Sequence, residues 1–295
     1  ERLEQFWKTS LPAGQGMMMP DMLDGLKSKK IKAMYIFGEN LANTEPDIGH
    51  VESCLASAEF LVVQDIFPNE TTRFAHVILP AAAWGEKDGT FSNSERRVSR
   101  VRAASTAPGQ AKMDWWIFKQ LAARFGHHWE SDSAQDLWDK EISVLAELFR
   151  GIKYRRIEGD GLQWPCPHED HPGTPVLHLD GAFTRGKGLF VSVNWTPAAE
   201  VADAEYPFVL SSGRRLYHYH TRTQTGRSKG LNTLMGYDTA DISTTDAARL
   251  QIADGETIRV SSRRGSVTVR AKVTDDMPAG MVWMAFHFRE SNANW

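Results

Sequence analysis

Two short apolar runs on either side of a helical segment constrain the fold of this chain more than any other feature. The first run, Ile31 to Phe37, is followed by Gly38, and the second covers Phe60 to Phe67. Uninterrupted apolar runs of this length are typical of strands that are buried on both faces. Between them, apolar residues recur at the spacing of one helix face: Ile48, Val51, Leu55 and Ala58. A strand, a helix and a strand joined by short loops form a right-handed βαβ unit, so the sequence predicts a parallel α/β sheet.

The rest of the chain divides into a helical part, a connector and a β part. Helices are expected from Asp114 to Gly126 and over residues 133–149, whereas residues 151–205 are rich in Pro, Gly and His and show weak periodicity. From residue 206 on, apolar and polar residues alternate and turn dipeptides separate the runs. We therefore predict an α/β domain over residues 1–150, a connector over 151–205 and a small β-barrel over 206–295.

Composition excludes several classes of partner and site. The chain has 295 residues, and its formal net charge is −3, whereas a nucleic-acid-binding or membrane-surface domain normally carries a basic excess. Cys54 and Cys166 lie far apart and neither has a CxxC companion, so no disulfide framework or cysteine-rich metal site is predicted. No run approaches the ~18 apolar residues of a membrane span.

The two lone cysteines favour a reducing, cytoplasmic compartment. A periplasmic location is the alternative, because an export signal would precede residue 1. The chain begins at Glu1 and stops directly after a strand-like run, so we expect it to be a piece of a longer protein.

Polar residues follow both predicted parallel strands. Gly38-Glu39-Asn40 comes after the first strand and Gln64-Asp65 after the second. In open α/β sheets, ligands bind in the crevice outside these strand ends. A carboxylate there, such as Asp65, can accept two hydrogen bonds from the N1 and amino groups of a guanine. The alternative is that these residues only cap loops.

A second run, "WGEKDGTFSNSERRVSR", combines glycines, serines and arginines after Trp84. Glycines let a backbone approach a ligand closely, and Lys or Arg can neutralise phosphate. A solvated charged turn explains the same composition. Lys87 in this run is considered together with Asp114, although an Asp at a helix start is usually an N-cap.

The segment "SSGRRLYHYHTRTQTGRSKG", residues 211–230, is the strongest candidate site. It holds five Lys or Arg residues, and no Asp or Glu occurs between Tyr206 and Tyr237. Ser212-Gly213-Arg214 directly follows a predicted strand, where free backbone amides and arginines can hold a pyrophosphate. His218, Tyr219 and His220 add flat, partly polar surfaces. A nucleic acid would need such residues over a broad face, whereas a polyanionic ligand in a cleft needs this one concentrated patch.

Signatures of catalysis are absent from the sequence. The chain has no GxSxG, Walker or HExxH motif, so no catalytic residue and no metal ligand is predicted. Cys166, His168 and His171 in "PCPHEDHPG" imitate a metal site, but their irregular spacing in a Pro-rich loop favours surface histidines.

Several motifs in order resemble those of the molybdopterin oxidoreductases, the dimethyl sulfoxide reductase superfamily. They are "AMYIFGEN", "VVQDIFPNETTRFAHVILPAAAWGEKDGTFSNSERRVSR", "GRRLYHYHTRT", "DAARLQIADGETIRVSSRRGSV" and "FHFRESNAN". Within that family the chain is most similar to the C-terminal half of formate dehydrogenase catalytic subunits. The resemblance implies an α/β domain for the guanine end of one dinucleotide, followed by a double-psi β-barrel that is truncated at its C-terminus.

The resemblance also implies a cofactor and its contacts. The cofactor is a bis-molybdopterin guanine dinucleotide that carries molybdenum or tungsten. The matching positions in this sequence are Gly38, Glu39, Asn40, Gln64, Asp65, Lys87, Asp114, Ser212, Gly213, Arg214, Arg215, Leu216, Tyr217, His218, Tyr219, His220, Thr221, Phe286 and Asn294.

The family's remaining machinery has no counterpart in the chain. Its [4Fe–4S] cysteine motif and its Cys or selenocysteine metal ligand would lie upstream of residue 1. The implied reaction is oxidation of formate to carbon dioxide, with the N-terminal part of the same subunit and iron–sulfur subunits as partners, and we expect this chain alone not to catalyse it. The alternatives are a nitrate reductase of the same family and a stand-alone cofactor-binding module without catalysis.

Overall fold

The computed structural model describes all residues except 1, 182 and 184, and the chain forms two compact units. The first unit comprises Glu1–Gly16 and Pro80–Val193, and the second comprises Met17–Leu79 and Asn194–Trp295. Each unit is therefore assembled from two separate stretches of sequence. The division differs from the expected order of domain, connector and domain, because the first parallel strands share a unit with the C-terminal strands.

The N-terminal stretch of the second unit contains the predicted βαβ arrangement. Strands β1 (Ala33–Phe37) and β2 (Phe60–Asp65) are parallel, and β3 (Val77–Pro80) lies beside β2. The helices of this stretch are α2 (Met19–Lys27), α3 (Leu41–Thr44) and α4 (Ile48–Ala56). Their apolar faces pack on the strands in one core that includes Leu23, Leu26, Ile36, Val51, Leu55, Leu61 and Val63. The parallel sheet predicted from the two apolar runs is confirmed.

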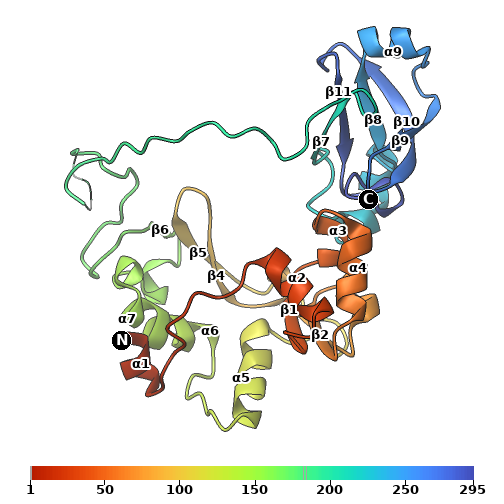
Figure 1. The fold of residues 1–295 in the computed structure, drawn as a ribbon. Helices are drawn as coiled ribbons and strands as arrows, with labels where there is room; N and C mark the ends of the chain where they lie inside the picture. The colour runs from red at the N-terminus through yellow and green to blue at the C-terminus, as the bar shows by residue number, and fades with distance from the viewer. Residues whose placement is uncertain (1, 182, 184) are drawn as a thin grey trace. The chain divides into compact units, whose positions relative to one another are not determined.

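The C-terminal stretch of the second unit forms a curled, mixed sheet (Figure 1). Its strands are β7 (Val209–Gly213), β8 (Thr239–Ser243), β9 (Thr257–Ser261), β10 (Ser266–Thr274) and β11 (Met281–Ala285). The strand order is β7-β11-β8-β10-β9, in which β7/β11 and β8/β10 are parallel and the other pairs are antiparallel. Helix α8 (Lys229–Leu234) lies between β7 and β8 in the sequence, and α9 (Thr244–Leu250) lies between β8 and β9. The predicted β part is thus a half-barrel around Ala240, Val269, Val282 and Met284.

Buried asparagine side chains join the two stretches of the second unit. Asn292 is fully buried, and its Nδ2 donates to the Asn43 carbonyl at 3.0 Å and to the Phe286 carbonyl at 2.8 Å. The Ile48 N–H donates to the Asn294 carbonyl at 3.0 Å, so the first residue of α4 is bound to the end of the chain. These contacts hold the strand-end loop after β1 against the segment that follows β11.

The first unit contains a short antiparallel sheet and several helices. Strands β4 (Gly89–Ser92), β5 (Arg97–Val101) and β6 (Leu162–Gln163) pair in sequence order. The α-helices are α1 (Arg2–Trp7), α5 (Asp114–Arg124), α6 (Ala134–Asp136) and α7 (Ser143–Leu145), with a π-helix at Leu137–Ile142. Ile152, Tyr154 and Cys166 lie in the core of this unit, so the start of the predicted connector packs as part of it.

Short 3-10 helices complete the secondary structure: Thr71–Phe74, Trp84–Glu86, Glu147–Phe149, Tyr154–Arg156, Thr225–Arg227 and Arg289–Ser291. Within the described ranges, no helix has both the length and the apolar character needed to cross a membrane.

Candidate functional site

The loop after β1 leaves two candidate residues exposed and uses the third to hold the loop. Gly38 has a φ of +65°, and its N–H donates to the Gln64 carbonyl at 2.9 Å. Glu39 is exposed, but Asn40 is buried and its Oδ1 accepts from the Thr71 hydroxyl at 3.0 Å. The Asn40 side chain therefore fixes the loop, while Gly38 is exposed with no atom within 4 Å of the position that a Cβ would take.

The two candidates at the end of β2 differ in their access to a ligand. Asp65 is half-buried; its Oδ1 accepts from the Ile66 N–H at 2.6 Å and its Oδ2 from Asn69 Nδ2 at 2.8 Å. The Phe67 N–H also bonds this carboxylate, so about one of its roughly four acceptor positions is left for a base. Burial raises the pKa of Asp65 above its usual value, although these hydrogen bonds lower it. Gln64, in contrast, is fully buried and accepts from the Tyr35 hydroxyl, so its side chain belongs to the interior.

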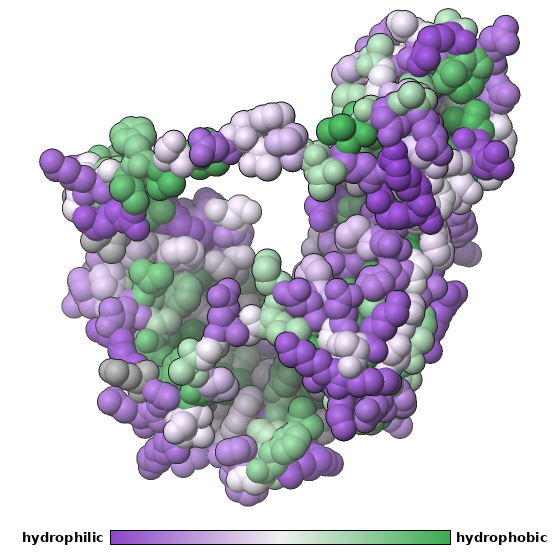
Figure 2. Space-filling view, in the orientation of Figure 1, coloured by the Kyte–Doolittle hydropathy of each residue, from purple (hydrophilic) through white to green (hydrophobic). Residues whose placement is uncertain are grey.

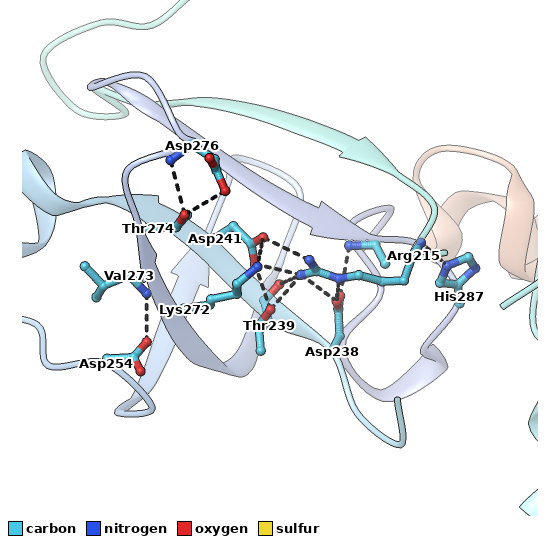
Figure 3. A network of polar contacts seen from close by, with 11 residues as sticks. Arg215, Asp238, Thr239, Asp241, Asp254, Lys272, Val273, Thr274, Asp276 and His287 are labelled. Atoms are coloured by element: carbon cyan, nitrogen blue, oxygen red, sulfur yellow. Dashed lines mark hydrogen bonds and ion pairs between the residues drawn. The ribbon is translucent and has the colours of Figure 1, made fainter. Parts of the chain in front are cut away.

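A buried ion-pair network occupies the base of the loop after β7 (Figure 3). Arg215 binds Asp241 through both terminal nitrogens, at 2.9 and 2.8 Å, and its Nε lies 3.4 Å from Asp238 Oδ1. The side chain of Arg215 is 11% exposed, and those of Asp238 and Asp241 are 0% and 10% exposed. The expectation that the arginines of residues 211–230 carry unneutralised charge is therefore wrong for Arg215, because its two acidic partners follow just after Tyr237.

Protonation in this network depends on how well each carboxylate is paired. Burial raises the pKa of Asp238 to about 6, even though Arg215 and the Ala285 N–H lower it. Burial also raises the pKa of Asp241, but the hydrogen bonds from Arg215 and Thr239 and the charges of Arg215 and Lys272 together outweigh burial and leave that pKa below its usual range. Asp238 and Asp241 contact the same guanidinium, but Asp238 binds a proton more readily than Asp241 does.

His287 fixes the loop after β7 to the segment after β11. Its Nδ1 donates to the His220 carbonyl, and its Nε2 accepts from the Arg215 N–H at 2.6 Å. Burial lowers the pKa of His287, which favours the neutral ring that this pair of bonds requires. The backbone positions of Arg215 and His220 are therefore set by one imidazole.

The other residues of the loop separate into exposed and buried sets. Arg214, Leu216, Tyr217 and Tyr219 are exposed, as is Ser212 at the end of β7. His218 is buried, with Nδ1 3.1 Å from Thr225 Oγ1 and Nε2 2.6 Å from the Met235 carbonyl, and Thr221 is also buried. The buried set stabilises the loop, and the exposed set faces outward.

Gly213 has a structural reason to be glycine. A Cβ at this position would lie 3.1 Å from the indole of Trp283 on the neighbouring strand β11. The space beside Gly213 therefore holds a side chain of the same sheet. The predicted role of the Ser212-Gly213-Arg214 backbone in holding a pyrophosphate stays a prediction.

The two late candidates also differ. The Phe286 ring lies 5.5 Å from the Arg214 guanidinium carbon and 5.8 Å from the His220 ring, so it extends the exposed surface of the loop. Asn294 Nδ2 donates to the Thr44 carbonyl at 3.0 Å and joins the end of the chain to α3. Phe286 is thus placed beside Arg214, whereas the Asn294 side chain has a structural partner.

A polar pocket of about 220 Å³ lies between the loop after β2 and the loops after β7 and β11. Its lining comprises Pro68, Asn69, Glu70, Thr221, Arg222, Thr223, Gly226, Arg227, His287, Arg289 and Glu290. Asn69 connects it to Asp65 through the hydrogen bond described above. The volume is below the ~300–1,000 Å³ of typical ligand pockets, so it suits one portion of a larger ligand.

Arg222 supplies the least satisfied polar group of this pocket. Its Nη2 donates to Asn232 Oδ1 at 2.9 Å and its guanidinium lies 4.5 Å from the Phe288 ring centre. Its Nε is buried and has no hydrogen-bond partner among the described residues. A buried donor without a partner costs about 1–3 kcal/mol, so an anionic ligand that accepts from it fits the site.

Sequence reasoning missed Arg222, Arg227 and Arg289. Arg222 and Arg227 lie in the acid-free segment, and the signal that identifies them is the continuation of that segment beyond Thr221. Arg289 had no such signal, because its guanidinium reaches the Ala42 carbonyl at 2.8 Å across a long sequence separation.

The candidates of the first unit form a separate group. Lys87 and Asp114 make an ion pair with side chains that are 23% and 22% exposed. The neighbouring charged run is used within the unit, since Arg100 and Arg102 both pair with Glu158. Cys166 is buried, and His171 Nδ1 accepts from the Gly173 N–H at 3.1 Å, so the "PCPHEDHPG" loop does not gather metal ligands.

The polar and aromatic groups around the pocket of the second unit are of kinds that bind ligands. It offers guanidinium groups, a half-buried carboxylate, an exposed glycine and exposed aromatic rings. Arginines and backbone amides recognise phosphate, and a carboxylate with two acceptor positions recognises a guanine edge. This donor set fits a phosphorylated guanine nucleotide.

Comparisons with known protein families and sequences agree with this chemistry. Residues 5–124 match the sequence model of the molybdopterin oxidoreductases, and residues 208–295 match that of the molydopterin dinucleotide binding domain. The chain is 44% identical to the F420-dependent formate dehydrogenase subunit alpha of Methanocaldococcus jannaschii over 294 residues, which are 99% of this chain and 43% of that protein. It is 32% identical to formate dehydrogenase H of Escherichia coli, over 98% of this chain and 41% of that protein.

Other relatives extend the comparison. The assimilatory nitrate reductase catalytic subunit of Bacillus subtilis is 32% identical over 94% of this chain and 40% of that protein. The fold is similar to that of acetylene hydratase from Pelobacter acetylenicus, with a TM-score of 0.66 at 18% identity over 92% of this chain and 40% of that chain. The chain thus spans about two fifths of the length of these relatives, and it belongs to the molybdopterin oxidoreductase family.

Proposed function

We propose that this chain is the portion of a formate dehydrogenase catalytic subunit that binds a molybdopterin guanine dinucleotide. The observation that carries the proposal is the polar pocket of the second unit, to which strand-end loops of both sheets contribute. The buried Arg222 Nε, which lacks a partner among the described residues, is a donor that a phosphate oxygen satisfies.

In this proposal, different side chains hold different parts of the dinucleotide. Arg222, Arg227 and Arg214 bind pyrophosphate oxygens, because charge-assisted hydrogen bonds to phosphate are strong and directional. Asp65 accepts from the guanine edge, and Phe286 lies beside Arg214 at the pterin end. Lys87 and Asp114 of the first unit, and the backbone at Gly38, are further candidate contacts. When bound, the metal–pterin group supplies two-electron redox chemistry, and the chain's residues bind and orient it.

The half-barrel is proposed to belong to the double-psi type. The support is its strand order, in which two parallel pairs, β7/β11 and β8/β10, are joined by the antiparallel pair β11/β8. Because β7 and β11 are parallel, the loops that follow them lie at the same end of the strands, where both can cover a large cofactor.

The whole protein is proposed to oxidise formate to carbon dioxide with molybdenum or tungsten at the pterin and a [4Fe–4S] cluster in the N-terminal part of the subunit. The support is that the chain is 44% identical to a protein named F420-dependent formate dehydrogenase subunit alpha. That name also supports coenzyme F420 as electron acceptor and further subunits as partners. A cytoplasmic location accords with the two buried free cysteines.

A nitrate reductase of the same family is the second candidate. The chain is 32% identical to the Bacillus subtilis nitrate reductase subunit, against 44% for the formate dehydrogenase subunit. The complete enzyme is expected to reduce a dye with formate and not to oxidise a reduced dye with nitrate. Turnover with nitrate alone would reverse the choice, and a complete protein without turnover on either would favour the binding module.

Arg214→Ala in the complete subunit is expected to weaken cofactor retention by roughly 10-fold, the value of one charge-assisted hydrogen bond. The guanidinium is exposed and makes no hydrogen bond or ion pair with the residues that the structure describes, so its loss should leave the fold intact. Molybdenum or tungsten per chain, measured by mass spectrometry with the pterin quantified by fluorescence, gives the result. Arg259→Ala, which removes an exposed arginine of β9, is the control.

Asp65→Asn tests the guanine contact in the same way, because an amide presents only one acceptor atom to the base. Cofactor content equal to that of the unmodified protein in both variants would contradict the proposed site.

A further inference from the structure

Three potential metal ligands meet on the surface of the second unit, away from the residues of the polar pocket. They are Asp24 on α2, with His50 and Cys54 on α4. His50 Nε2 lies 2.8 Å from Asp24 Oδ1 and 3.4 Å from Cys54 Sγ, and all three atoms lie within 4.8 Å of one another. Two different electron-pair donors thus approach the same imidazole nitrogen.

The sequence and the packing of the helices account for this convergence. His50 and Cys54 are four residues apart, so one turn of α4 places them on the same face. Asp24 approaches from α2, which packs against α4, and Leu26 of α2 and Leu55 of α4 both lie in the core described above. The Asp47 side chain caps α4 by accepting from the His50 N–H at 3.1 Å, which fixes the first turn of the helix.

We propose that Asp24, His50 and Cys54 form a zinc-binding site that links α2 to α4. Zinc binds thiolate sulfur, imidazole nitrogen and carboxylate oxygen at about 2.0–2.3 Å in a tetrahedron, which places ligand atoms roughly 3.3–3.6 Å apart. The observed separation of Cys54 Sγ and His50 Nε2 is 3.4 Å, already in this range. The Asp24 carboxylate, at 2.8 Å from His50 Nε2, has to move to reach the tetrahedral spacing, and its side chain is 65% exposed and therefore movable.

The chemistry of the three residues favours zinc over a catalytic role. In a Cys-His-Asp relay the carboxylate binds the imidazole nitrogen that is remote from the thiol. Here the carboxylate and the thiol both face Nε2, so the carboxylate cannot orient the ring for proton transfer. A single metal ion at the meeting point satisfies all three atoms, and a water molecule completes the tetrahedron.

Access to the site also suits an ion. The side chain of His50 is 40% exposed, whereas Cys54 is fully buried and forms the floor of the site. Figure 2 shows mainly hydrophilic residues over the part of the molecule that contains α2 and α4, and the Asp24 side chain is 65% exposed. Burial raises the pKa of the Cys54 thiol, so the ion has to displace its proton on binding. This site does not depend on the proposed cofactor function.

The test is a zinc titration of the reduced, chelator-treated protein, followed by calorimetry and by competition with a chromophoric chelator. We expect the unmodified protein to bind one zinc ion per chain and Cys54→Ala to abolish this binding. The zinc affinity should fall at least 10-fold with Asp24→Asn or His50→Gln. The matched control is Cys166→Ala, which removes the other buried free cysteine and should retain the ion. Cobalt substitution provides a second readout, because a thiolate ligand gives an intense charge-transfer band that Cys54→Ala abolishes.

Asp24→Asn alters only an exposed side chain, so a change in its zinc affinity cannot be attributed to misfolding. Zinc affinity that is the same in Asp24→Asn, Cys54→Ala and the unmodified protein would overturn the proposal. So would the absence of a thiolate band with cobalt, and the three residues would then be an ordinary histidine–aspartate pair above a buried cysteine.

Discussion

Replacing Arg215 by methionine is expected to lower the free energy of unfolding of the second unit by about 3–5 kcal/mol, because the change leaves two buried carboxylates without their cation. Asp238 and Asp241 are 0% and 10% exposed, and Arg215 is the cation that contacts both. Lys272 lies 3.4 Å from Asp241 but is half exposed, so it offsets little of the loss. Urea unfolding, with hydrogen exchange of the β8 and β11 amides as a local readout, measures the effect.

Two further variants separate charge from packing in this experiment. Arg270→Met removes an exposed arginine from β10 and should change stability by less than about 0.5 kcal/mol. Combining Arg215→Met with Asp238→Asn and Asp241→Asn removes the buried charges together, and should recover a large part of the loss. A loss below about 1 kcal/mol for Arg215→Met alone would show that the network behaves like an exposed salt bridge.

Asp238 is expected to make the second unit less stable as the pH rises from about 4 to 6. Its pKa is about 6 in the folded protein, against 3.8 ordinarily, so the folded form binds a proton that the unfolded chain has lost in this interval. Folding stability falls with pH wherever the folded state binds more protons. The shift of about two units corresponds to roughly 3 kcal/mol, which is present below pH 4 and lost above pH 6.

Asp238→Asn should remove this slope, because the amide keeps an oxygen for the Ala285 N–H and does not titrate. The measurement is the free energy of unfolding of both proteins from pH 4 to 7, compared as a difference so that other titrating groups cancel. Asp254→Asn, which alters an exposed turn residue, is the control and should keep the slope. Parallel curves for Asp238→Asn and the unmodified protein would contradict the assigned proton affinity.

Much of the fold follows from local patterns in the sequence. The two apolar runs and the helix between them predict β1, α4 and β2, because buried parallel strands need uninterrupted apolar residues. Strict alternation predicts β10, whose Val267 and Val269 lie in the half-barrel core. Strand β8 escaped prediction, because Asp241 lies within it. This buried carboxylate is explained only by Arg215, its partner from a segment distant in sequence.

The candidate site shows where sequence reasoning ends. Residue type and strand position suffice to select Asp65, Arg214 and the loop after β1. They do not reveal that Arg215 is neutralised or that Gln64 and His218 are buried, since those facts depend on residues that fold against them. Adjacent arginines in one motif, Arg214 and Arg215, thus have different environments, one exposed and one enclosed by carboxylates.

The discontinuous second unit has a consequence for synthesis on the ribosome. Its first stretch ends at Leu79 and its second begins at Asn194, so 114 intervening residues (80 to 193) must be translated before the partner stretch starts to emerge. At 5–20 residues per second this takes roughly 6–23 s. During that time the loop after β1 lacks Asn292, its buried partner. The nascent chain therefore exposes a surface to which a chaperone can bind.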